Sequence, residues 1–182
     1  VVGKVDYQIE PIVEEIELGS LLKDIDGLEA TLDLNRFSLA IDLKTNISVP
    51  ILADLSIIPY KDGAVISGRE LKKNLEITMP EATDEPALVR FWISNYPQGE
   101  DKYMPAGYEH ISLDLLSLIA AMPDKIELVL NAGTDPEKTA SIAPSEDGYV
   151  LEAEYALSLP LEFGEDAAIE FRQVIDDLPV EL

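Results

Sequence analysis

Any chemistry in this sequence depends on one histidine, many carboxylates and a tyrosine-rich segment, because the chain has no cysteine. The histidine, His110, is alone, which excludes a multi-histidine metal site, and no Gly-x-Ser-x-Gly elbow accompanies it. We interpret His110 as an ordinary loop residue. The sequence therefore predicts no catalytic residue, no metal ligand and no cofactor, and the chain is not expected to be an enzyme.

The carboxylates are too numerous for any one pair of them to be informative. The 36 Asp and Glu residues against 13 Lys and Arg give a formal net charge of −23. Asp24 and Asp26 lack the spacing of a calcium loop, and Asp62-Gly63 and Asp147-Gly148 are typical turn dipeptides. The excess acid favours solubility, with divalent-cation binding as the alternative. Nucleic acid and anionic membrane surfaces are excluded as partners, since contacts to phosphate need Lys and Arg.

The segment from Asn95 to His110, NYPQGEDKYMPAGYEH, is the best candidate for a binding surface. The candidate ligand-binding residues are Trp92, just before it, and Tyr96, Tyr103 and Tyr108 within it. Aromatic rings stack on the apolar faces of sugars while polar neighbours bind the hydroxyls, so a polysaccharide is the expected ligand. Long loops on rigid β scaffolds often carry binding residues. The alternative is that Trp92 lies in the core and the tyrosines plug one end of a sandwich.

A β-sheet is expected to position this loop, and the clearest sign of one is Phe37 to Ile57. Ten of its eleven odd positions are hydrophobic, as in a strand with one face on a core. At about 3.3 Å per residue it is too long for one ordinary strand. Either it turns near Thr45-Asn46, best through a three-residue connection from Lys44, or it crosses between two sheets with Pro50 at an edge or bulge. Both alternatives predict an all-β protein, a β-sandwich with one or two short helices.

Helical spacing occurs at Leu18 to Leu28 and at Ile111 to Met122, where Leu115, Leu116, Ile119 and Met122 share one face. Shorter alternating or β-prone segments predict further strands. These are 5–9, 28–34, 64–67, 75–79, 87–94, 126–130, 149–161 and 168–182.

Glu81 to Pro86, EATDEP, is the best candidate for a domain boundary. It predicts two tandem sandwich-like modules, 1–80 and 87–182, with one elongated sandwich over 1–182 as the alternative. The halves resemble each other as a helix, a strand and a long strand: Asn35 and Asn131 are 96 positions apart, and Pro50 and Pro160 are 110 apart. The alternative to a diverged repeat is that short amphipathic strands are alike in composition.

The stretch from Ile111 to Phe171, including PDKIELVLN and YALSLPLEFGEDAAIEF, resembles the β-rich modules of uncharacterised exported lipoproteins from Bacteroidetes-type bacteria. In those modules a strand ends in a PLxFG-like turn, and Pro160 to Gly164 holds that place. Asn46 to Ile51, NISVPI, resembles a second recurring element. The resemblance covers about half the chain. It implies a sandwich-like fold, export, and attachment to the envelope through an acylated N-terminal cysteine, which this sequence does not contain. It offers no catalytic residue.

Together these features predict a non-catalytic structural or adhesive module of a bacterial cell-envelope lipoprotein. The alternative is a carbohydrate-binding module that uses the aromatic loop 92–110. The expected location is outside the cytoplasm, associated with the outer membrane or the cell surface, and the expected partner is an envelope protein or a polysaccharide. No run of 18 apolar residues predicts a membrane span, so a lipid anchor upstream of Val1 is the expected attachment.

Overall fold

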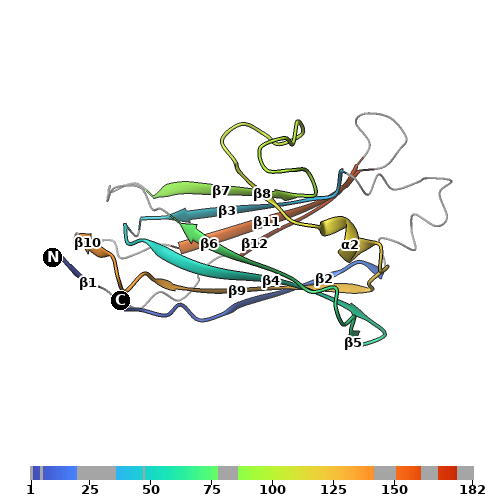
Figure 1. Ribbon diagram of the computed structural model, residues 1–182, viewed down its shortest axis with the longest axis horizontal. Coiled ribbons are helices and arrows are strands. Elements are labelled where there is room, and N and C mark those ends of the chain that lie inside the picture. Colours follow the sequence, from blue (N-terminus) through green and yellow to red (C-terminus); the bar gives the residue numbers. More distant parts are fainter. Residues whose placement is uncertain are drawn as a thin grey trace.

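The computed structural model describes residues 2–4, 6–19, 36–46, 48–77, 86–141, 151–160 and 168–175. Their strands form two five-stranded sheets that lie face to face (Figure 1). A small antiparallel ladder of β1 (Val2–Lys4) and β10 (Thr139–Ser141) lies at one end. The prediction of an all-β sandwich is confirmed.

The first sheet has the order β12-β11-β3-β7-β8 and is antiparallel except for the parallel pair β7 and β8. Its strands are Ala168–Ile175 (β12), Leu151–Pro160 (β11), Ser38–Thr45 (β3), Ala87–Ser94 (β7) and Glu109–Ser112 (β8). The second sheet has the order β2-β9-β4-β5, with β6 also paired to β4. Its strands are Ile12–Glu17 (β2), Lys125–Thr134 (β9), Ile51–Lys61 (β4), Ala64–Val65 (β5) and Leu71–Ile77 (β6).

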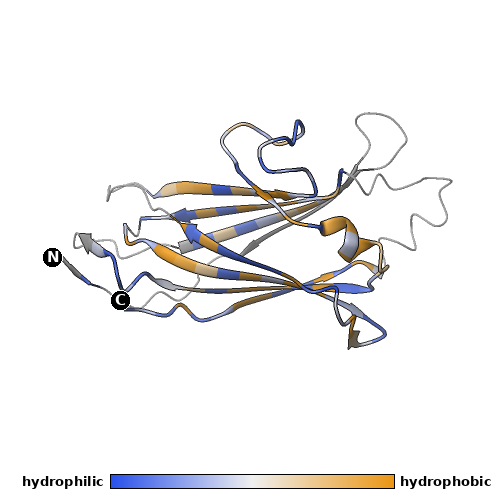
Figure 2. Ribbon diagram, viewed as in Figure 1, coloured by the Kyte–Doolittle hydropathy of each residue, from blue (hydrophilic) through white to orange (hydrophobic). Residues whose placement is uncertain are grey.

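The long alternating stretch crosses from one sheet to the other. Its first part is β3 and its second part is β4, and these strands belong to different sheets. A hairpin near Thr45-Asn46 is therefore wrong. The stretch does cross between the two sheets, but as two strands with Pro50 in their connection, not as the one long strand that the second alternative expected. Apart from Lys61 at the end of β4, the odd residues of both strands are buried, most of them in the shared core, while most even ones are more exposed. Figure 2 displays this alternation along the strands.

Each sheet contains strands from both halves of the sequence. β3 lies between β7 and β11, and β4 pairs with β9. One cluster of buried hydrophobic residues is shared by both sheets. The division into modules 1–80 and 87–182 therefore does not describe how these strands pair. The proposed repeat remains a prediction, because its first helix and strand fall almost wholly on residues outside the described ranges.

The helix predicted over Ile111 to Met122 is only partly right. Residues 109–112 form β8, and the helix α2 is Leu115–Ile119. Its N-cap is Asp114, whose Oδ1 accepts a hydrogen bond from the Ser117 N–H at 3.0 Å. Leu115, Leu118 and Ile119 are buried at one end of the sandwich (Figure 1).

Met122 was expected on the same buried face but is 51% exposed, at a positive φ of 50°. The helix ends before it, so the i, i+3 spacing no longer places its side chain against the core.

A small cavity of about 40 Å³ lies between the sheets beside Tyr155. Its walls are mainly aliphatic and include Ile41, Leu43, Leu55 and Leu128. The Tyr155 side chain is buried, and burial together with the negative charge of Glu14 raises the pKa of its hydroxyl to about 12.

We expect Leu118→Ala to lower the free energy of unfolding by about 3 kcal/mol, because it leaves a cavity at the closed end of the core. Met122→Ala in the same segment should change it by no more than about 0.5 kcal/mol. Urea unfolding followed by circular dichroism measures both. Equal losses for the two variants would contradict the placement of α2.

We expect Tyr155→Phe to remove part of the alkaline loss of stability. An unfolded tyrosine ionises near 10, whereas Tyr155 in the folded protein resists ionisation to about 12, so its contribution is complete below pH 10 and is lost as the pH rises toward 12. Wild type should therefore lose about 1–2 kcal/mol relative to Tyr155→Phe between pH 9 and 11.5. If the free energies of unfolding of wild type and Tyr155→Phe change in parallel across that pH range, the raised pKa of Tyr155 is refuted.

Candidate functional site

The tyrosine-rich segment lies on the outer face of the first sheet, above β7 and β8 (Figure 1). Along β7 the side chains alternate, and Phe91 and Ile93 are buried in the shared core. Trp92 lies between them in sequence and therefore on the opposite face, where it is partly buried. Trp92 is thus not a residue of the core between the sheets, and the loop after β7 covers an outer face.

The buried carboxylate of Asp101 holds this loop on the sheet. Trp92 Nε1 donates a hydrogen bond to Asp101 Oδ2 at 2.7 Å, and the Tyr103 N–H donates to Oδ1 at 2.8 Å. The Ser94 hydroxyl is a third partner. Burial raises the pKa of Asp101, but the hydrogen bonds from Ser94, Trp92 and Tyr103 outweigh it and leave the pKa below its ordinary value.

His110 completes this polar network and is not the ordinary loop residue that the sequence predicted. It lies in β8 and is buried. The Gly99 N–H donates to His110 Nδ1 at 2.7 Å, so this nitrogen carries no proton and Nε2 does. Nε2 lies 2.9 Å from Ser94 Oγ and donates to it. Gln98 binds the strand beside it, through the His110 carbonyl and the Ser112 N–H.

A serine, a histidine and an aspartate are therefore in contact, but in the reverse of a catalytic order. In a hydrolase the histidine takes the serine proton on an unprotonated nitrogen and the aspartate holds the other nitrogen. Here the nitrogen that faces Ser94 already carries a proton, and Asp101 accepts from Ser94 instead. Ser94 is also only 1% exposed. This arrangement fixes the loop and does not activate Ser94.

The four predicted aromatic residues form two pairs. Trp92 and Tyr108 meet edge to face with centroids 5.9 Å apart, and Tyr96 and Tyr103 are tilted at 6.0 Å. Trp92, Tyr96 and Tyr108 are partly buried, whereas Tyr103 is 40% exposed. Of the four, Tyr103 therefore presents its ring most openly to a partner.

Cationic side chains lie beside two of these rings, and they were not among the residues predicted for the site. Arg36 Cζ lies 4.1 Å and Lys102 Nζ 5.0 Å from the centroid of the Tyr103 ring. Arg90 Cζ lies 5.5 Å from that of Tyr108. Lys102 could have been found as the neighbour of Tyr103 in sequence. Arg36 could not, because only the fold brings the residues just before β3 to this loop.

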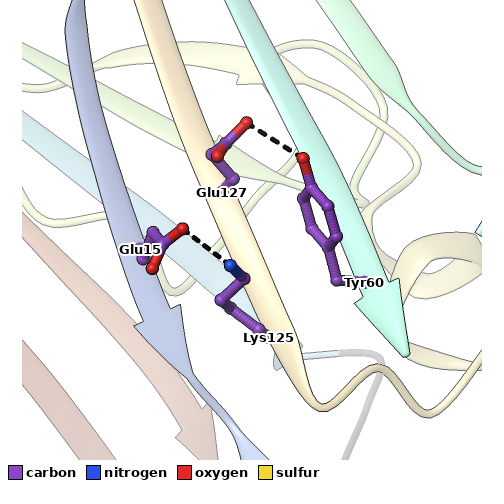
Figure 3. A network of polar contacts seen from close by, with 4 residues as sticks. All are labelled: Glu15, Tyr60, Lys125 and Glu127. Carbon is purple, nitrogen blue, oxygen red and sulfur yellow. Dashed lines mark hydrogen bonds and ion pairs between the residues drawn. The ribbon is translucent and has the colours of Figure 1, made fainter. Parts of the chain in front are cut away.

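A second polar cluster lies on the outer face of the other sheet (Figure 3). Lys125 Nζ is 2.6 Å from Glu15 Oε1, and the Tyr60 hydroxyl donates to Glu127 Oε1 at 3.3 Å. Burial and the carboxylate of Glu127 raise the pKa of Tyr60, and the hydrogen bond to Glu15 raises that of Lys125. Each carboxylate is engaged with a neighbouring strand, so the cluster ties β2, β9 and β4 together as surface contacts.

The part of the chain that the structure describes contains no group of three or more His, Cys, Asp or Glu side chains placed to hold a metal ion. Its helices include none that is long and apolar enough to cross a membrane.

No protein-family model matches this sequence, and no curated protein matches it. Among solved structures, one that is similar is the crystal structure of a presumed secreted protein from Parabacteroides distasonis, with 16% sequence identity and a TM-score of 0.46. The match covers 88% of this chain and 54% of that protein, so this chain spans about half of its length. A likeness this distant carries no argument about function.

We expect Asp101→Asn to lower the free energy of unfolding by about 2 kcal/mol at pH 7, because the buried carboxylate loses charge-assisted hydrogen bonds. The folded pKa lies below the ordinary 3.8, so the stabilisation is complete above about pH 5 and disappears as the pH falls through 3.8 toward the folded value. The gap between wild type and variant should therefore narrow below pH 4. Urea unfolding measured by Trp92 fluorescence tests this, with the exposed Glu100→Gln as the control. A gap that is independent of pH would refute the role of the carboxylate.

Proposed function

We propose that this chain is a non-catalytic, adhesive module of an exported bacterial protein and that its contact surface is the loop 95–108. The observation that carries the proposal is that Tyr103 is presented openly on a loop whose base is fixed to the sheet. The backbone of Tyr103 is anchored to Asp101, which is itself held by Trp92. A fixed loop loses little conformational entropy on binding, which favours recognition.

The buried serine, histidine and aspartate of this loop support the non-catalytic part of the proposal. Ser94, Asp101 and His110 are buried and bonded to one another in the order that holds the loop. The exported, envelope-associated location is supported by the resemblance of Pro160 to Gly164 and of Asn46 to Ile51 to modules of Bacteroidetes-type lipoproteins. Within that location, attachment through a lipid anchor is part of the proposal.

Carbohydrate binding is the specific form of adhesion that the aromatic site favours. Sugar rings bind to exposed aromatic side chains that polar groups flank. Tyr103, with Tyr96 at 6.0 Å and Lys102 beside it, offers such a surface, whereas Trp92 and Tyr108 are engaged with each other. This narrows the four candidate residues to Tyr103 and its neighbour Tyr96 as the contact, with Trp92 and Tyr108 as its support.

We expect Tyr103→Ala to remove saturable binding to a panel of bacterial and plant polysaccharides while leaving the free energy of unfolding within about 0.5 kcal/mol of wild type. The reason is that the Tyr103 side chain is 40% exposed and its anchor to Asp101 uses the backbone. Binding is measured by affinity electrophoresis and by the fluorescence of the single tryptophan, Trp92, beside the loop. Tyr60→Ala, on the other sheet, is the matched control and should bind like wild type. Absence of binding across the panel would leave a structural spacer as the better assignment.

A further inference from the structure

We propose that Arg36, Lys102 and Tyr103 form a binding site for an acidic polysaccharide, in which the cations take the carboxylate of a uronic acid and the ring supports the sugar. The inference deepens the adhesive function proposed above and rests on it, because it assigns the chemical class of the ligand at the same loop.

Two positive charges lie beside the Tyr103 ring. The chain has only 13 Lys and Arg residues against 36 Asp and Glu, yet two of those cations converge on the most exposed aromatic ring of the loop. They come from distant places in the sequence, Arg36 from just before β3 and Lys102 from the loop itself. A net charge of −23 repels polyanions over most of the surface, so an acidic ligand can bind only where cations are concentrated.

Two other cations on the described part of the same sheet face are already paired with carboxylates. Lys44 is paired with Glu152 at 2.9 Å, and Arg90 with Asp42 at 3.5 Å. By contrast, the ion pairs found within the described ranges include none made by Arg36 or Lys102. These two charges are held by the Tyr103 ring, and a ring leaves them able to bind a carboxylate.

The arrangement of Arg36 and Lys102 around Tyr103 suits a charged sugar better than a neutral one. A guanidinium beside a ring can direct N–H donors to a carboxylate in a bidentate pair, and the ammonium of Lys102 adds a second charge. Because Arg36 already lies over the Tyr103 ring, part of that ring is covered by a cation, and stacking alone has less surface to use. The carboxylate therefore supplies the main contact, and the exposed remainder of the ring supplies the apolar one.

The test compares polygalacturonate with fully methyl-esterified polygalacturonate, which keeps the sugar rings but removes the negative charge. Binding is measured by isothermal titration calorimetry in low salt with EDTA, so that calcium cannot bridge the ligand to acidic side chains of the protein. Dextran sulfate is the third ligand and tests for attraction to any polyanion. The variants are Arg36→Gln, Lys102→Gln and Lys102→Glu, and Lys44→Gln on the same sheet face is the matched control. Because Lys102 is exposed, its variants remain informative even if Arg36→Gln fails to fold.

The expected result is that polygalacturonate binds, that the ester and dextran sulfate bind at least about tenfold more weakly, and that Lys102→Gln or Arg36→Gln weakens Kd about tenfold. Lys102→Glu should abolish binding, and Lys44→Gln should leave it unchanged.

Equal binding of acid and ester, lost in Tyr103→Ala but kept in the cation variants, would overturn this inference and leave the carbohydrate-binding function intact. If dextran sulfate binds as tightly as polygalacturonate, the site attracts any polyanion, and the inference is overturned as well. Failure of polygalacturonate to bind, when another polysaccharide binds through Tyr103, refutes the acidic ligand alone; failure of every polysaccharide refutes both proposals.

Discussion

The covering of two apolar sheet faces by each other is the constraint on which this structure depends. Each inward face carries side chains such as Ile41 and Leu55 that lose contact with water only when the other sheet packs on them. The chain meets this requirement by passing from β3 directly to β4 in the opposite sheet, which makes the two layers parts of one folding unit. The short helix α2 then closes one end with Leu118.

With both inward faces used for the core, any partner must bind at an edge, an end or an outer face. On the outer face of the first sheet, Asp101 replaces apolar packing by hydrogen bonds to Trp92, Ser94 and Tyr103. Such a buried carboxylate is stable only when its partners are all present, which is why the loop is fixed by several contacts at once. The same requirement commits His110 to the tautomer that excludes it as a base toward Ser94.

The distribution of charge distinguishes the aromatic loop from the acidic surface around it. A surface with so much acid is soluble and repels similar surfaces, but it offers few places for an anion. Across the outer face, Lys44 and Arg90 are used in ion pairs between strands, where such pairs contribute little stability but favour one register. Arg36 and Lys102 instead stand beside Tyr103, and this makes the loop chemically different from the rest of the sheet.

The sequence by itself determined the fold class and the presence of a tyrosine-rich loop, because alternation with a period of two and clustering of tyrosines are local properties. It placed β3, β4, β7 and β11 closely and found half of β9. It missed β1, β8 and β10, and also β2, where the two adjacent acids of IVEEIE hide the alternation. Only the tertiary structure decided that strands from both halves share each sheet, that Asp101 binds Trp92, and that Arg36 reaches Tyr103 across 67 positions. Those contacts join residues far apart in the chain, and period and composition carry no information about which strand lies beside which.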